Sequence, residues 1–156
     1  MAEFATLQDK VDFETAVPIE DRWSARTVYE FLSQTVERKQ SEPAITFQIT
    51  SGPKDKRETF SYTELLGKVT QTANLFRSLG VGETDVVAYL LPNCNETVLT
   101  FLGGVTAGIV NPINPLLEPE KLASLLRATG AKVLVTLAPM VGVYVLSYAL
   151  EAVAGI

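Results

Sequence analysis

DVVAYLL at residues 85–91 is a short, almost wholly apolar run that ends at Pro92-Asn93. Its length and its β-branched residues are typical of a strand that is covered on both faces, as in a parallel sheet. Asn93 or Asn95 can cap a following helix that runs to about Ala107, and this helix is apolar nearly all round. We therefore expect a buried strand followed by a buried helix.

The segment after this helix repeats the alternation. Residues 109–110 form a short strand, residues 111–115 a turn, and residues 119–128 a helix with a proline in its first turn, where the missing amide costs nothing. Gly130 ends that helix, and residues 132–136 form a third apolar strand. Strand, helix, strand, helix, strand predicts an α/β fold with a βαβαβ parallel-sheet layer flanked by helices, whose strand order the pattern leaves open.

Two capping boxes mark helices upstream of this unit. Thr27 with Glu30 begins a helix that frays near residues 38–41, and Ser61 with Glu64 begins a second one. In each box the hydroxyl accepts from the backbone amide of the glutamate, and the carboxylate reaches back to the capping residue. Both signals predict helices rather than loops.

A short β-hairpin is predicted between these helices. Residues 44–49 alternate as a half-buried strand, with Ile45, Phe47 and Ile49 on one side, and residues 58–62 form the second strand after a polar link. The helix that follows carries one apolar stripe and ends at Gly80, a natural left-handed stop. The stripe consists of Leu65, Val69, Ala73, Phe76 and Leu79.

The cysteine and histidine content excludes several kinds of chemistry. The chain has one cysteine, Cys94, and no histidine. An intrachain disulfide, a Cys/His zinc site and a Ser–His–Asp or Cys–His catalytic pair are therefore excluded. The start of the chain lacks the basic and apolar pattern of a signal peptide, so we expect a cytoplasmic protein.

The charge pattern gives no sign of a nucleic-acid partner. The formal net charge is −5, whereas affinity for a phosphate backbone comes largely from clustered lysine and arginine. The basic residues are scattered, apart from a cluster of Lys54, Lys56 and Arg57. We interpret that cluster as a solvated loop rather than a phosphate-binding patch.

Three residues are candidates for chemistry. Cys94 would be a nucleophile activated by a helix amino terminus, but without a histidine as base a small filler next to the sheet is the simpler interpretation. Glu96 and Glu118 are candidate acid–base groups on composition alone. Neither has an evident partner carboxylate, and a place in the first turn of a helix, where a negative charge suits the dipole, explains both. We therefore assign no catalytic, cofactor-binding or metal-binding residue.

The sequence lacks the loops that hold nucleotide phosphates. The turn after Leu91 contains no glycine, although the dinucleotide-binding fingerprint needs glycines there. Gly103, Gly104 and Gly108 come too late, and the glycines at 80 and 82 precede a strand instead of following one. The Walker pattern is also absent.

The order of short segments between residues 42 and 139 resembles the amino-terminal part of acyl-CoA synthetases and related AMP-forming (adenylate-forming) ligases. Each segment is weakly specific, but their order and spacing over roughly a hundred residues carry the resemblance. The segments are PAI at 43–45, TFSYTEL at 59–65, ANL at 73–75, LGVGETDVV at 79–87, LPN at 91–93 with Glu96, Gly103, AGIVNPINP at 107–115 and AKVLVT at 131–136.

This resemblance implies a parent enzyme that joins a fatty or aryl acid to AMP with ATP and magnesium, and then transfers the acyl group to coenzyme A. It also implies an α/β large domain. In that family a Ser/Thr/Gly-rich loop with a lysine holds the phosphates, and a small carboxy-terminal domain brings the catalytic lysine. This sequence has neither, so no catalytic residue is carried over, no cofactor is assigned to it, and we expect it to be inactive alone.

We divide the chain into an extended amino-terminal arm at 1–26, a partial α/β domain at 27–139 and an atypical apolar tail at 140–156. Residues 133–150 carry no charge, so the end of the chain is a soluble core or interface segment or, less simply, a membrane segment that Pro139 and Gly142 interrupt. A truncation, a frame change or a cloning scar would each explain this departure from the family.

Three hypotheses remain open. The first is a catalytically incomplete piece of an acyl-CoA synthetase, which would expose apolar surface and self-associate. The second is an interaction module that keeps the scaffold and uses the apolar tail to dock a partner or a second copy. The third is a nucleotide-binding α/β protein of another kind, which measurable ATP affinity would support.

Overall fold

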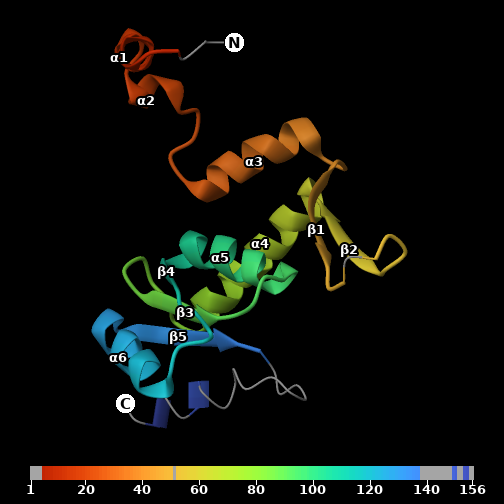
Figure 1. Cartoon of the computed structure of the whole chain (residues 1–156), viewed down its shortest axis with the longest axis vertical. Helices are drawn as coiled ribbons and strands as arrows, with labels where there is room; N and C mark the ends of the chain where they lie inside the picture. Colours follow the sequence, from red (N-terminus) through yellow and green to blue (C-terminus); the bar gives the residue numbers. More distant parts are fainter. Residues whose placement is uncertain (1–4, 51, 138–148, 151–152, 155–156) are drawn as a thin grey trace.

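A three-stranded parallel sheet and a separate two-stranded hairpin organise the chain (Figure 1). The computed structural model describes residues 5–50, 52–137, 149–150 and 153–154. The elements, in chain order, are α1 (Leu7–Ala16), α2 (Ile19–Arg22), α3 (Val28–Lys39), β1 (Pro43–Gln48), β2 (Arg57–Ser61), α4 (Tyr62–Ser78), β3 (Val86–Leu90), α5 (Asn95–Ala107), β4 (Ile109–Pro112), α6 (Pro119–Thr129) and β5 (Ala131–Thr136).

The parallel sheet has the strand order β4-β3-β5, so the apolar run that predicted a buried strand lies in the middle. The chain leaves β3 through α5 to reach β4 on one side, and returns through α6 to reach β5 on the other. Crossovers that run in opposite directions place their helices on opposite faces when both have the usual hand. The predicted βαβαβ parallel sheet is confirmed.

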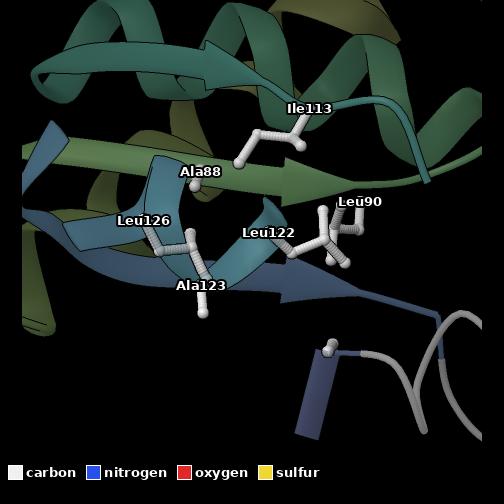
Figure 2. Packing of buried hydrophobic residues seen from close by; sticks show 7 residues of the cluster. Ala88, Leu90, Ile113, Leu122, Ala123 and Leu126 are labelled. Carbon is white, nitrogen blue, oxygen red and sulfur yellow. The ribbon is translucent and has the colours of Figure 1, made fainter. Parts of the chain in front are cut away.

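Each face of the sheet has its own hydrophobic core, because side chains alternate along β3. Val87 packs with Phe76 of α4 and Ala107 of α5, whereas Ala88 and Leu90 pack on the other face. Figure 2 shows this second core, in which Leu122, Ala123 and Leu126 of α6 meet Ala88, Leu90 and Ile113. A strand covered on both faces explains why residues 86–91 lack charged positions.

Two glycines let α5 approach its neighbours closely. A Cβ added at Gly103 would lie 2.6 Å from Thr72 Cγ2 of α4, and one at Gly104 would collide with Val110 Cγ2 of β4. Both glycines are buried, as the apolar sequence of this helix predicted. Gly103 allows close packing against helix α4, and Gly104 allows close packing against strand β4.

The outer edge of strand β4 includes a proline. The amides of Ile109 and Ile113 donate to the carbonyls of Asp85 and Tyr89 on the β3 side, so alternate amides face the neighbouring strand. Pro112 therefore occupies a position whose nitrogen faces away from β3, where a missing donor is tolerated. This edge is poorly suited to accept a further strand.

The hairpin forms as predicted, with one correction. β1 and β2 pair antiparallel, and Thr46 Oγ1 lies 2.9 Å from Thr59 Oγ1 across the pair. Ile49, expected on the same face as Ile45 and Phe47, is 86% exposed. Pairing stops at Gln48, so the chain has already left the strand and alternation no longer defines a face there.

The helix starts agree with the sequence in part. The capping box of Ser61 and Glu64 is complete, with the Ser61 amide donating to the Glu64 carboxylate over 2.8 Å. In the other predicted box, Thr27 Oγ1 accepts from the Glu30 amide, but the Glu30 carboxylate accepts from the amide of Arg26 instead of Thr27. The reciprocal half of that box was therefore predicted wrongly.

The predicted asparagine cap of α5 was wrong. Its N-cap is Cys94, whose side chain makes no capping hydrogen bond. Asn95 is the first helical residue, and its side-chain amide donates to Glu58 of the hairpin. The predicted helix ends are confirmed at Gly80 and Gly130, which both adopt positive φ, at 83° and 60°. Leu79, the last residue of the predicted stripe on α4, is exposed, unlike the other four.

The expected extended arm is mostly helical. Thr6 and Asp9 form a capping box that begins α1, and Arg22 of α2 donates to the carbonyls of Val17 and Phe13. None of the residues of α1 and α2 is buried, and Figure 1 shows these helices at the end of the molecule remote from the sheet. The extended conformation was therefore predicted wrongly. Because α1 buries no residue, its sequence has no apolar stripe from which a helix could be predicted.

Most of the predicted apolar tail, residues 140–148, 151–152 and 155–156, lies outside the described residues. Of the tail residues that are described, Ala149 is buried and belongs to the same core cluster as Leu122, Ala123 and Leu126 of α6. In the part of the chain that is described, no helix is long and apolar enough to span a bilayer.

Candidate functional site

The carboxyl edge of the parallel sheet is the place where this architecture would bind a ligand. β3 leads into α5 and the neighbouring β4 leads into α6, on opposite faces of the sheet. Ligands of open α/β sheets bind where the loops after adjacent strands separate in this way. In this chain those loops are residues 91–94 and residues 113–118.

A cleft of about 360 Å³ opens beside the first of these loops. Its walls come from β1 of the hairpin, from the loop after β3 and from the first turn of α5. The hairpin wall is mostly apolar, and the wall from the loop and α5 is mostly small and polar. The lining residues are Ile45, Thr46, Phe47, Asn93, Cys94, Asn95, Thr97 and Val98.

Cys94 lies in this cleft at the amino terminus of α5 and is half-buried. Its Sγ is 3.2 Å from Thr97 Oγ1, and Thr97 also donates to the carbonyl of Pro92. These contacts hold the turn between β3 and α5.

Asn95 ties the cleft to the hairpin. The residue is 3% exposed, and its Nδ2 donates to Glu58 Oε2 over 2.6 Å. This is a charge-assisted hydrogen bond between α5 and β2, which the sequence motifs did not predict. The two residues are 37 positions apart, so no local pattern signals the contact.

The two glutamates considered as acid–base groups start different helices. Glu96 lies in the first turn of α5, as expected from the helix dipole, and Glu118 is the N-cap of α6, one residue before its first turn. Both side chains are exposed. In the portion of the chain that is described, no three Cys, Asp or Glu side chains gather as metal ligands would.

A charged pair, Asp85 and Lys132, lies at the opposite, amino edge of the sheet. Lys132 Nζ donates to Asp85 Oδ2 over 2.8 Å and to the carbonyl of Gly80 over 2.5 Å. Asp85 also accepts from the amide of Gly82. The hydrogen bond from Lys132, and after it that from Gly82, lower the pKa of Asp85. The pair joins the starts of β3 and β5 to the end of α4.

The residues at the carboxyl edge do not fit a triphosphate with magnesium. The loop after β3 contains Pro92 and Asn93 where phosphate-binding loops carry glycines. Lys132 faces the other edge, and the cluster of Lys54, Lys56 and Arg57 is exposed around the hairpin turn. Among the described residues, this edge therefore offers no set of groups that would hold ATP together with a metal ion.

Sequence comparison identifies the family of this chain. The profile of AMP-binding enzymes matches residues 32–154. The chain belongs to the AMP-binding enzyme family. It is 34% identical over 122 residues to marinolic acid–CoA ligase of Pseudoalteromonas sp. (strain SANK 73390), covering 78% of this chain and 19% of that ligase.

Two further relatives agree with this assignment. The chain is 36% identical over 94 residues to 4-coumarate–CoA ligase of Pinus taeda, covering 60% of this chain and 17% of the ligase. A fatty acyl CoA synthetase of Mycobacterium tuberculosis superposes with a TM-score of 0.63 at 24% identity, over 75% of this chain and 22% of that structure. The last match shows a shared fold.

The chain spans about a fifth of the length of the curated AMP-binding relatives that it matches. The matched region corresponds to amino-terminal domains of adenylate-forming enzymes. An N-terminal domain of one such enzyme from M. tuberculosis, solved separately, superposes over 76% of this chain with a TM-score of 0.64. The resemblance recognised in the sequence is thereby confirmed.

Proposed function

We propose that this chain forms the amino-terminal part of an ATP-dependent ligase that activates a small carboxylic acid as its acyl-adenylate and transfers the acyl group to coenzyme A. The observation that carries the proposal is the match of residues 32–154 to AMP-binding enzymes together with the parallel sheet that those residues form. The ligases that it resembles act on acids as different as marinolic acid and 4-coumarate. A fatty or aryl acid is accordingly the proposed substrate class.

ATP, magnesium and coenzyme A belong to the whole enzyme in this proposal. The described residues supply the scaffold: two helices on one face of the sheet, a third on the other, and the hairpin hydrogen-bonded to α5 through Glu58 and Asn95. Adenylyl transfer needs positioned cations and donors around the phosphates. The described part of the carboxyl edge offers no such set, so the chain by itself should not turn over.

The test is carboxylate-dependent exchange of pyrophosphate into ATP by the purified chain. A panel of benzoate, 4-coumarate, octanoate and palmitate covers the proposed substrate class. The expected result is exchange no greater than in a blank without protein. A signal that needs both chain and carboxylate would contradict the proposed incompleteness.

Reading the gene in all three frames beyond the codon for Ile156 tests the origin of the chain. A Ser/Thr/Gly-rich loop with a lysine within the next few dozen codons would support a piece of a longer ligase. A genuine stop codon without such a loop in any frame would favour the second candidate, a non-catalytic interaction module. Leu150 and Val153 support that candidate, since these tail residues are exposed and accessible to a partner.

A cytoplasmic location is proposed for the parent enzyme, because ATP and coenzyme A are intracellular reagents and the single cysteine precludes an intrachain disulfide. Fractionation of the source cells, with the chain followed by antibody, checks this. Recovery in the membrane pellet after a high-salt wash would contradict it.

A further inference from the structure

An aromatic groove lies between α2 and the start of α3, far from the carboxyl edge of the sheet. It has a volume of about 410 Å³, and we call it the Trp23 groove after its most prominent residue. Trp23, Val28 and Phe31 supply its apolar wall, and Arg26 lies between them in sequence. Trp23 is 71% exposed and Phe31 is 60% exposed, so both rings are accessible to a ligand.

Hydrogen bonds hold the groove in shape. Ser24 Oγ donates to Gln34 Oε1 over 2.7 Å, and Gln34 Nε2 donates back to the Ser24 carbonyl over 2.6 Å. This pair fixes the segment after α2 against α3. Arg22 also lines the groove and is held in place, because its guanidinium lies 4.1 Å from the centroid of the Phe13 ring and donates to the carbonyls of Val17 and Phe13.

The Arg26 guanidinium is the group that gives the groove chemical character. The Arg26 backbone amide donates to the Glu30 carboxylate, but within the described residues the Arg26 side chain makes no hydrogen bond or ion pair. A guanidinium presents a planar fork of donors that matches a carboxylate in bidentate geometry. An unpaired fork beside two aromatic rings is the combination that binds a planar anion: the rings stack and the fork pairs.

We propose that the Trp23 groove binds a small aromatic carboxylate, with its ring against Trp23 and Phe31 and its carboxylate on Arg26. This site lies apart from the carboxyl edge of the sheet and does not depend on the proposed ligase function. Glu20, Asp21 and Glu30 are acidic groups on the two helices that form the groove, and they oppose an anion. The affinity is therefore modest, and removal of Glu30's charge should raise it.

The chain contains a single tryptophan, so Trp23 emission reports directly on the groove. The probe is phenylacetate, which does not absorb at the excitation wavelength of tryptophan, and its neutral match is phenylacetamide. Phenylacetate should change Trp23 emission saturably, and phenylacetamide should bind about tenfold more weakly, the cost of losing a hydrogen bond to a charged group. Equal binding of acid and amide would overturn the proposal.

Variants separate the groove from a non-specific surface effect. Arg26→Gln should weaken phenylacetate about tenfold, Arg26→Lys should give an intermediate loss, and Glu30→Gln, which keeps an acceptor for the Arg26 amide, should strengthen binding. Arg38→Gln, in the last turn of α3, is the matched control and should change nothing. Unchanged binding in Arg26→Gln with native circular dichroism would sink the assignment.

Measurements on the protein without ligand test whether the same groove binds a second copy of the chain. Emission of Trp23 is recorded over a wide range of chain concentration without ligand. Constant emission is the expected result for an open groove. A concentration-dependent shift that phenylacetate does not reverse would place a second copy there and overturn the ligand proposal.

Discussion

At the scale of single residues, the ion pair between Asp85 and Lys132 is a clear electrostatic contribution to the fold. Lys132 and the Gly82 amide stabilise the ionised carboxylate, which lowers the pKa of Asp85 in the folded chain. A group with a depressed folded pKa stabilises the fold above its unfolded pKa, about 3.9 for aspartate, and loses that contribution as the pH falls through the folded value. Asp85 thus contributes at neutral pH and not in strong acid.

We predict that Asp85→Asn lowers the melting temperature at pH 7. The deficit relative to the unmodified chain should shrink as the pH falls below about 4, because the unmodified carboxyl is then protonated as well. Thermal unfolding followed by circular dichroism from strongly acidic to neutral pH measures this. Glu83→Gln, an exposed acid two positions away, is the control and should be neutral. A deficit that does not vary with pH would refute the electrostatic explanation.

The hydrogen bond between Asn95 and Glu58 is a second stabilising contact between single residues. Asn95 is buried, so replacing it with alanine removes a charge-assisted bond and loosens the hairpin from α5. We predict a loss of about 1–3 kcal/mol in the free energy of unfolding for Asn95→Ala, measured in urea. A double-mutant cycle with Glu58→Ala should show coupling of at least about 0.5 kcal/mol. Strict additivity would mean that the two side chains do not interact in solution.

At the scale of elements, α5 depends on glycines that bring it against α4 and β4. A methyl group at Gly103 would meet Thr72 Cγ2 at 2.6 Å and the Ala73 nitrogen at 3.1 Å, and the second of these is backbone that cannot rotate away. We predict that Gly103→Ala destabilises the chain by about 1–3 kcal/mol through overpacking. Urea unfolding monitored by circular dichroism is the measurement.

The matched control for this prediction is in the chain. Gly67 lies in α4, is exposed, and has no atom within 4 Å of an added Cβ. Gly67→Ala should therefore stabilise the chain by up to about 1 kcal/mol, the helix-propensity difference. If both substitutions moved stability in the same direction, close packing would not be the reason for glycine in α5.

The elements themselves were largely predictable because their signals are local. The apolar run before Pro92 identified β3, and Pro119 with Gly130 bracketed α6. Helix α1 was not predicted because it buries no residue, so it has no periodic stripe to detect, and its capping box uses Asp9 instead of the usual Glu or Gln. Ile49 was misplaced because alternation in sequence continues beyond the point where pairing stops.

Contacts between distant segments were not predictable from a single sequence. Lys132 and Asp85 are 47 positions apart, and their meeting requires the strand order β4-β3-β5, which the pattern leaves open. The Trp23 groove was not predicted for a different reason. It forms where an arm expected to be extended folds into two short helices before α3, and an extended arm would not bring Trp23 into one groove with Phe31.

At the scale of the whole molecule, a small scaffold leaves much apolar surface exposed on several separate faces. These include the outer side of α4 and α5, the loop after β4, and the tail beyond β5. Leu150 and Val153 represent the tail, and they are 61% and 49% exposed. Dispersed apolar surface favours open-ended association, whereas a single docking face favours a closed dimer.

We predict open-ended self-association for an incomplete ligase domain. In sedimentation velocity the average mass should rise continuously with concentration, without a plateau at twice 17.0 kDa. Leu150→Lys with Val153→Lys removes one face only, so this double variant should reduce the association partly. The corresponding pair Leu75→Lys with Phe101→Lys, on α4 and α5, should reduce it to a similar extent. A defined dimer that the tail variant abolishes and the α4–α5 variant leaves intact would instead identify the chain as an interaction module that docks through its tail.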